Sequence, residues 1–148
     1  MYFKKNLLII AILLPAAVFA ENNMCIGLWE TKGNDSVVNI FIQKNKYFGE
    51  VVWLKSTYWE DGMPLKDIFN PDKEESRKPI LGKIILKNFV AQSNTTLING
   101  TIYDPHNGKS YKCIIKNEDD ILKVKGYIGI PLFGSTETWK RRTRIYEN

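Results

Sequence analysis

The stretch "KSYKCIIKNEDDILKVKGYI", residues 109–128, predicts two antiparallel strands joined by a tight polar turn. Alternate positions on both sides of the turn are apolar or small, and lysines fill positions between them. The alternating set is Tyr111, Cys113, Ile115, Leu122, Val124 and Gly126. Because side chains alternate between the faces of a strand, one face of this hairpin points into a core and the other into water.

Outward from this hairpin, short runs rich in Val, Ile, Tyr, Phe, Trp and Thr recur between turns of Gly, Asn and Asp. Beyond residue 25 no stretch keeps a helical period for long. Strands are expected near 26–32, 37–43, 46–54, 80–89, 97–103, 109–116, 121–128 and 134–142. About eight short strands indicate an all-β fold, an antiparallel up-and-down β-barrel formed by a single domain, residues 21–148.

The same alternation assigns side chains to the barrel interior. In "GKIILKNF", residues 82–89, it places Ile84 and Leu86 inside and Lys83 and Lys87 outside. The aromatic residues expected inside are Trp29, Tyr47, Trp53, Tyr111 and Trp139. An eight-stranded barrel is either filled by side chains or holds one small ligand, and the sequence leaves both outcomes open.

Residues 1–20 have the form of a secretory signal peptide. Lys4 and Lys5 begin it, the apolar run "NLLIIAILLPAAVF" follows, and "VFA" ends at Ala20 with small residues at the cleavage positions. The apolar run is short for a transmembrane span, although an uncleaved membrane anchor is the alternative interpretation. We therefore expect cleavage before Glu21, and an exported protein of the periplasm or extracellular space with no transmembrane segment in the mature chain.

The charge of the mature chain does not indicate nucleic-acid binding. Loss of two lysines with the signal peptide lowers the net charge from +5 to +3. The one basic cluster is "KRRTR", residues 140–144, near the end of the chain. A nucleic-acid-binding domain would show a basic stripe with interleaved aromatic residues, so we expect no nucleic-acid partner.

The chain has two cysteines, Cys25 and Cys113. An even number of cysteines in an oxidising compartment predicts one disulfide between them. Two separate buried thiols are the alternative.

The only histidine, His106, lies in the turn "DPHNG", residues 104–108. Proline presets the first central position of such a turn, and Gly108 tolerates the positive φ of the return. His106 is therefore interpreted as a turn residue with no predicted partner. One histidine and two distant cysteines give neither a catalytic constellation nor the clustered ligands of a metal site, and no cofactor is predicted.

The longest irregular segment spans residues 55–79. Its aromatic residues Tyr58, Trp59 and Phe69 stand beside the carboxylates Glu60, Asp61 and Asp67. Such a segment either forms a lid over a binding site or plugs one end of the barrel. We place a candidate ligand site at the barrel mouth under this segment, with binding residues Tyr47, Trp53, Trp59, Tyr111 and Glu137.

The first and last strands are expected to close the barrel, so that Trp29 and Trp139 meet at one end. Arg141 shares a strand face with Trp139 and is predicted to stack on an indole. Glu137 lies on the same face, and an inward carboxylate needs a partner. It is therefore either paired with a cation such as Arg141 or part of a ligand site.

Five segments resemble a family of exported bacterial proteins, domain-of-unknown-function family 2147. They are "GLWET", "YFGEVVWL", "NPDKEESRKPILGKIIL", "GTIYDPHNGKSYKCII" and "LKVKGYIGIPLFGSTETWKR", and they cover about residues 26–142. The resemblance implies a small exported β-barrel and brings no established activity. Ser135 stands where the family would be expected to have a basic residue. "GLW" with the later Trp139-Lys140-Arg141 also resembles the closing motif of lipocalin-like barrels.

Three functions follow from these observations. The preferred one is a non-enzymatic binding protein that holds a small apolar or amphipathic ligand in the barrel mouth. The second is an envelope interaction protein with a filled barrel that contacts another protein. The third is an enzyme that uses carboxylates such as Glu60, Asp61 or Glu137. No motif with a catalytic mechanism favours the third.

Overall fold

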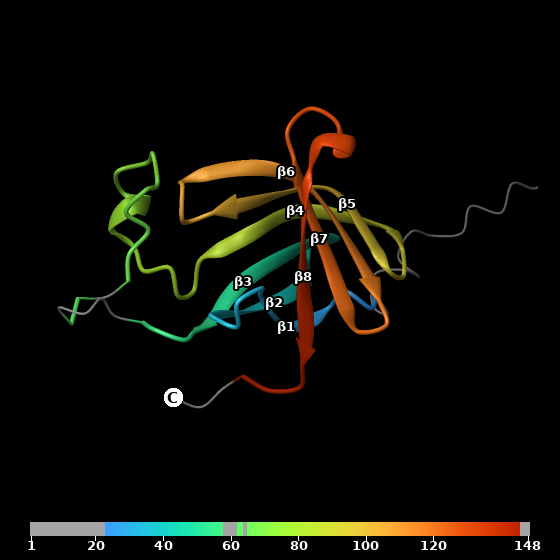
Figure 1. Ribbon diagram of the computed structural model, residues 1–148, viewed down its shortest axis with the longest axis horizontal. Coiled ribbons are helices and arrows are strands. Elements are labelled where there is room, and N and C mark those ends of the chain that lie inside the picture. The colour runs from blue at the N-terminus through green and yellow to red at the C-terminus, as the bar shows by residue number, and fades with distance from the viewer. Residues whose placement is uncertain (1–22, 58–61, 64, 146–148) are drawn as a thin grey trace, which may run out of the picture.

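The computed structural model describes residues 23–57, 62–63 and 65–145. Eight antiparallel strands form one closed barrel in sequence order (Figure 1). The strands are β1 (Gly27–Glu30), β2 (Ser36–Gln43), β3 (Lys46–Leu54), β4 (Ile84–Ser93), β5 (Thr96–Asp104), β6 (Lys109–Glu118), β7 (Ile121–Tyr127) and β8 (Ser135–Arg142). Pairing of β1 with β8 closes the barrel. The predicted fold class, an up-and-down barrel, is confirmed.

Among the described residues, two short 3-10 helices lie in the connections: η2 (Glu75–Arg77) between β3 and β4, and η3 (Pro131–Phe133) between β7 and β8. The β3–β4 connection extends from one end of the barrel in Figure 1. Because strands alternate in direction, the connections β1–β2, β3–β4, β5–β6 and β7–β8 share this end. We call it the open end, and the opposite end the closed end.

The closed half of the barrel is filled by large side chains. Among the described residues, the largest with almost no exposed surface are Trp29, Trp139, Tyr47, Phe89, Ile40, Leu86, Leu97, Ile115 and Leu122. Phe89 packs over Gly100 on the neighbouring strand, so closely that a Cβ atom at Gly100 would overlap the ring. The glycine thus makes room for an aromatic ring in a barrel of small diameter.

Residues 23–26 lie across the closed end and join it to distant strands. The backbone N–H of Met24 donates to the carbonyl of Asn94, 2.7 Å away. The side chain of the buried Asn117 donates to the carbonyl of Met24 at 2.6 Å. These bonds satisfy backbone groups at the end of the barrel.

Arg141, predicted to stack on an indole, stacks on that of Trp29. Its guanidinium carbon lies 4.1 Å from the centre of the Trp29 ring, because Arg141 is the direct cross-strand partner of Trp29. Arg141 also donates to the carboxylate of Asp120 at 2.6 Å and to the carbonyl of Ile26 at 3.1 Å. The Trp29 indole donates to the Cys25 carbonyl at 2.8 Å.

The predicted disulfide is absent from the structure, in which Cys25 and Cys113 are buried free thiols. Cys25 donates to the carbonyl of Thr95 at 3.3 Å, and Cys113 to that of Ile114 at 3.7 Å. Burial raises the pKa of Cys25 to about 11 and that of Cys113 to about 12. Both thiols therefore stay protonated and unreactive at neutral pH. The alternative of two separate buried thiols describes this arrangement.

The predicted alternation fails at the start of β4. Leu86 pairs with Gly49 and Ile84 pairs with Glu50, so the register shifts between the two pairs. Both Ile85 and Leu86 are buried as a result. An extra residue in one strand changes which face the following side chains occupy, and this is why Ile84 does not share a face with Leu86.

None of the helices described here is both long enough and apolar enough to span a membrane.

Candidate ligand site at the open end of the barrel

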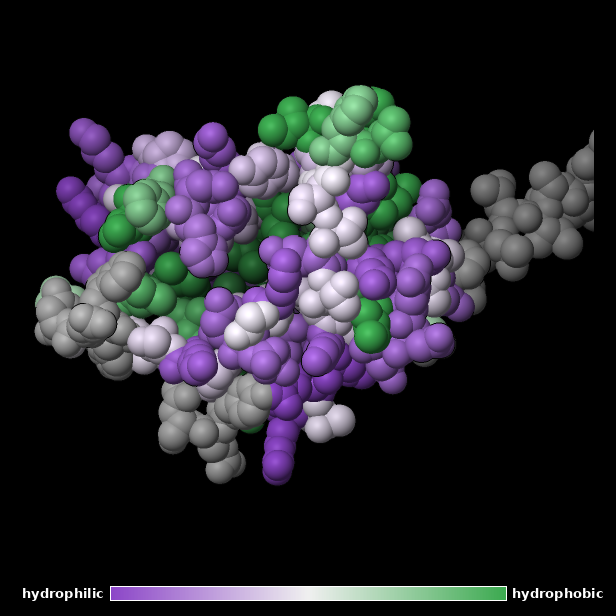
Figure 2. All heavy atoms as spheres, viewed as in Figure 1, coloured by the Kyte–Doolittle hydropathy of each residue, from purple (hydrophilic) through white to green (hydrophobic). Residues whose placement is uncertain are grey.

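The open half of the barrel contains a cavity of about 1010 Å³. Most of its wall is apolar and comes from strands and from the β3–β4 connection. The apolar lining residues are Val51, Leu54, Leu65, Ile68, Phe69, Ile80, Ile85, Ile102, Val124 and Trp139. Figure 2 shows this hollow as hydrophobic surface enclosed by hydrophilic side chains. The sequence left a filled barrel and an open one as alternatives, and the structure combines them in a barrel that is filled in one half and open in the other.

The cavity exists because inward side chains shrink toward the open end. Along β7 the inner positions read Leu122, Val124 and Gly126. Leu122 pairs with the buried Trp139, whereas Gly126 pairs with Ser135. The volume of the cross-strand pair therefore falls from the closed half to the mouth, and a barrel of constant strand number is left with unfilled space.

Glu137 is an exposed residue of β8 that lines this cavity together with the buried Trp139. The Trp139 indole donates to Glu137 Oε2 at 3.1 Å. Glu137 therefore lines the cavity and does not pair with Arg141. Arg141 is engaged instead by Asp120 and by backbone carbonyls at the closed end.

The β3–β4 connection forms one wall of the cavity. Leu65, Ile68 and Phe69 line it, although Ile68 and Phe69 are also more than half exposed. Lys66 and Pro79 form an isolated antiparallel bridge that joins two segments of the connection. The described part of the connection therefore acts as a side wall, and leaves the cavity open.

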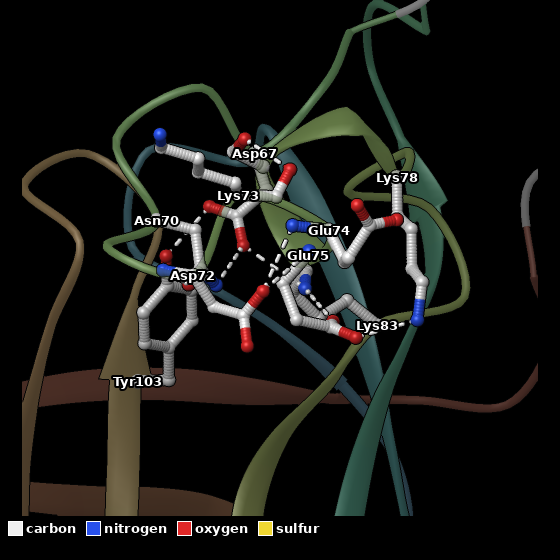
Figure 3. Close-up of polar contacts among 10 residues, drawn as sticks. Asp67, Asn70, Asp72, Lys73, Glu74, Glu75, Lys78, Lys83 and Tyr103 are labelled. Carbon is white, nitrogen blue, oxygen red and sulfur yellow. Dashed lines mark hydrogen bonds and ion pairs between the residues drawn. The ribbon is translucent and has the colours of Figure 1, made fainter.

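A cluster of charged and polar side chains around the buried Asp67 fastens this wall to the barrel. Figure 3 shows Asp67, Asn70, Glu75, Lys83 and Tyr103 converging, and we call these residues the Asp67 cluster. Asp67 is fully buried. Its carboxylate accepts hydrogen bonds from Tyr103 at 2.6 Å and Asn70 at 2.7 Å, and lies 2.9 Å from the Lys83 ammonium. Lys83 also contacts Glu75 at 2.9 Å.

The electrostatics of the cluster favour the ionised pair. Burial disfavours the charged form of Lys83, but hydrogen bonds and charges from Glu75 and Asp67 outweigh it and raise its pKa. Hydrogen bonds from Lys78 and Lys83 lower the pKa of Glu75 to about 2. Burial, and then the hydrogen bond to Asp67, raise the pKa of Tyr103. Lys83 is thus cationic and Glu75 anionic at neutral pH, and Tyr103 keeps the proton that it donates.

The prediction that Lys83 points into water was wrong, because only 9% of its side chain is exposed. Asp67 was recognised only as one of several loop carboxylates. A signal for its burial was present: Asp67 stands between Leu65 and the pair Ile68–Phe69, and an acid within an apolar run needs a partner.

Only some of the predicted binding residues line the cavity. Tyr111 and Glu137 line the cavity. Tyr47 does not: it is buried in the closed half, pairs with Phe89, and has its pKa raised by burial and by Cys25. Trp53 does not line the cavity either. The register of β2 and β3 shifts between Val37 and Val38, after which Leu54 takes the lining position. Trp59 lies outside the described residues.

The β5–β6 turn contributes to the rim. His106 occupies the predicted turn and its side chain is 86% exposed, yet it has a partner: its backbone N–H and its ring Nδ1 lie 2.9 and 3.0 Å from Asp104 Oδ1. Gly108 has a φ of +70°, as predicted for the return of the turn. A Cβ atom there would overlap the carbonyl oxygen of Phe69. The turn therefore touches the cavity wall directly.

Comparison with known proteins supports the architecture. The solved structure described as "Protein HP1028 from the human pathogen Helicobacter pylori belongs to the lipocalin family" is similar, with a TM-score of 0.68 and 22% sequence identity over 80% of this chain and 82% of that chain. At this identity the likeness shows the fold alone. No curated protein matches the chain.

The sequence profile of the bacterial family DUF2147, described as "Uncharacterized protein conserved in bacteria", matches residues 27–141. This range runs from the first residue of β1 almost to the end of β8, and so includes the barrel and its cavity. The resemblance noted in the sequence is confirmed, and the chain belongs to the DUF2147 family.

Proposed function

We propose that the protein is a non-enzymatic binding protein that holds a small apolar or amphipathic ligand in the cavity at the open end. One observation carries the proposal: an apolar-walled space of about 1010 Å³ lies inside a barrel whose other half is tightly packed. Cavities of roughly 300–1000 Å³ are typical of small-molecule sites. An apolar ligand would remove this wall from water, with a gain of roughly 25 cal/mol per Å² of apolar surface.

The polar lining is sparse enough to orient a ligand without making the cavity hydrophilic. Tyr111 and Glu137 project from strands, and Asn107 donates to the Tyr111 hydroxyl at 3.0 Å. This bond leaves the Tyr111 proton available for a ligand acceptor. The enzymatic alternative gains no support from the described part of the cavity, where the group bonded to Glu137 is the indole of Trp139.

Filling the cavity should abolish uptake of an apolar probe. Gly126 lies on the inner face of β7, and a Cβ atom there would make only ordinary contacts, 3.5 Å from Ile102 and 3.6 Å from Tyr111. We expect Gly126→Leu to weaken binding of the neutral fluorophore N-phenyl-1-naphthylamine by about tenfold or more, because its side chain occupies the ligand's space. Fluorescence titration measures the affinity, and quenching of tryptophan emission reports contact with Trp139.

Lys125→Leu is the matched control, since Lys125 is adjacent to Gly126 and on the opposite face of the same strand. It adds the same side chain to the outside of the barrel and should leave probe affinity unchanged. Equal probe binding by wild type and Gly126→Leu, with both folded, would contradict a site in this cavity.

We also propose export to the periplasm or beyond the cell, supported by the basic start, apolar run and small residues of positions 1–20. Those residues lie outside the described part of the structure. Protein recovered from the cell envelope should begin at Glu21 when its N-terminus is sequenced. An envelope fraction that begins at Met1 would contradict cleavage and favour the uncleaved membrane anchor.

A second candidate function, interaction with an envelope protein, is favoured by the β7–β8 connection. Figure 2 shows this connection as a hydrophobic projection at the top of the molecule. Ile128, Ile130, Leu132 and Phe133 are all more than half exposed. Lys112 and Lys125 lie on the adjoining strands. The partner that fits is an apolar protein surface flanked by acidic residues. Failure of the folded wild-type protein to take up the probe would favour this second function.

A further inference from the structure

The cavity has a marked asymmetry in where its charges lie. Glu137 is a charged lining residue in the interior of a strand, at the level of Val124. The other lysine, aspartate and histidine residues that line the cavity stand on connections or at a strand end. They are Lys32, Asp35, Lys55, Lys66, Asp104 and His106. Among the described residues, the charge that lines the cavity from within a strand is therefore negative, whereas the charges on the connections and at the strand end are of both signs.

Glu137 also keeps unused hydrogen-bonding capacity. A carboxylate can accept about four hydrogen bonds. Among the described residues, the hydrogen bond made to Glu137 is that of the Trp139 indole, to Oε2. Arg141 shares its strand face but is held at the closed end by Asp120 and by the stack on Trp29. A ligand in the cavity would thus meet a carboxylate that the protein itself leaves largely unpaired.

We propose that the cavity selects amphipathic amines: ligands with an apolar body and a cationic, hydrogen-bond-donating head group that contacts Glu137. This inference rests on the proposed function and names its ligand class. A neutral apolar ligand would displace water from the carboxylate without replacing its hydrogen bonds, and a carboxylate head group would add a like charge. An ammonium supplies both opposite charge and donors, and the neighbouring Trp139 ring also favours a cation.

The alternative polarity places an anionic head group at the rim lysines Lys32, Lys55 and Lys66. Lys32 and Lys55 are exposed, as Glu137 is, but they stand on connections and have long flexible side chains, so fixing them on a head group costs side-chain entropy. The Glu137 carboxylate is on a strand and is already held by the Trp139 indole. Glu137 is therefore the group that sets the charge preference.

Three matched probes test the preference: decylamine, decanol and decanoate, each used at pH 7 to displace N-phenyl-1-naphthylamine. In wild type we expect decylamine to displace at a concentration about tenfold or more below that of decanoate, in line with the strength of charge-assisted hydrogen bonds. Glu137→Gln should reduce this ratio to about twofold or less, while the decanol concentration stays the same. Glutamine keeps the acceptor for Trp139, so the fold should be retained.

Glu118→Gln is the charge control, because Glu118 is an exposed residue at the end of β6, paired with Lys116. It removes the same charge from the molecule and should keep the amine preference of wild type. A wild type that prefers decanoate, or a Glu137→Gln protein that keeps the full amine preference, would overturn the inference and leave the proposed function intact. Absence of fluorophore binding by the folded wild type would overturn both.

Discussion

Replacing Trp29 by alanine is expected to destabilise the protein by about 3–5 kcal/mol, the cost of removing a buried aromatic side chain. Trp29 has no exposed surface and belongs to the core of the closed half. The substitution also removes the donor to the Cys25 carbonyl and the ring beneath the Arg141 guanidinium. Arg141 links β8 to residues 24–26 and to the β6–β7 turn, so the loss extends to the whole closed end.

Urea unfolding followed by circular dichroism measures this loss. Trp53→Ala is the comparison, because Trp53 is a half-buried tryptophan on the same barrel, outside the core cluster. We expect it to cost about 1–2 kcal/mol, in the usual range for single substitutions. Trp29→Phe should lie between the two, since it keeps an aromatic ring under Arg141 and loses the indole N–H. Equal losses for Trp29→Ala and Trp53→Ala would contradict the role of Trp29 in closing the barrel.

The barrel was predictable because the alternation of apolar and polar residues along each strand shows which side chains face the interior. In the hairpin of residues 109–128, Cys113, Ile115, Leu122 and Val124 are buried and line up across the two strands, as their alternation indicated. Alternation of apolar and polar residues is a strong local signal when one face of each strand is exposed to solvent. Closure of the barrel by the first and last strands was also predicted, and their pairing makes Trp29 and Arg141 direct neighbours.

The errors in facing come from features that no single strand encodes. Trp53 and Ile84 were assigned to the interior by counting along their own strands. In the structure each stands next to a register shift, between Val37 and Val38 on β2 for Trp53 and between the Gly49 and Glu50 pairs for Ile84. A bulge depends on the partner strand, so a pattern read along one strand carries no sign of it.

The candidate site was only partly predictable for a related reason. Tyr111 and Glu137 lie on strands and were found by alternation. The Asp67 cluster joins residues that are far apart in the sequence, with Tyr103 and Asp67 separated by 36 positions. Its members come from an irregular segment, where no period relates one side chain to the next. Only folding of the barrel beneath the segment brings Lys83 and Tyr103 to Asp67.

Gly108→Val is expected to cost roughly 3 kcal/mol or more, because it combines two unfavourable effects. Gly108 has a φ of +70°, which a β-branched residue adopts only with strain of about 1–2 kcal/mol. The new Cβ atom would also overlap the backbone carbonyl of Phe69, which no side-chain rotation can relieve. Either the β5–β6 turn or the cavity wall must move.

Gly129→Val separates the two effects. Gly129 has a nearly identical φ of +74°, but nothing lies within 4 Å of the position its Cβ would take. It should show the backbone strain alone, about 1–2 kcal/mol in urea unfolding, and keep its affinity for the fluorophore. Gly108→Val should lose both more stability and more affinity, because Phe69 lines the cavity. Equal effects of the two substitutions would mean that the cavity wall adjusts to the new side chain without loss of stability. The contact between Gly108 and Phe69 would then have no part in holding the cavity open, and the Asp67 cluster alone would fix the position of the wall.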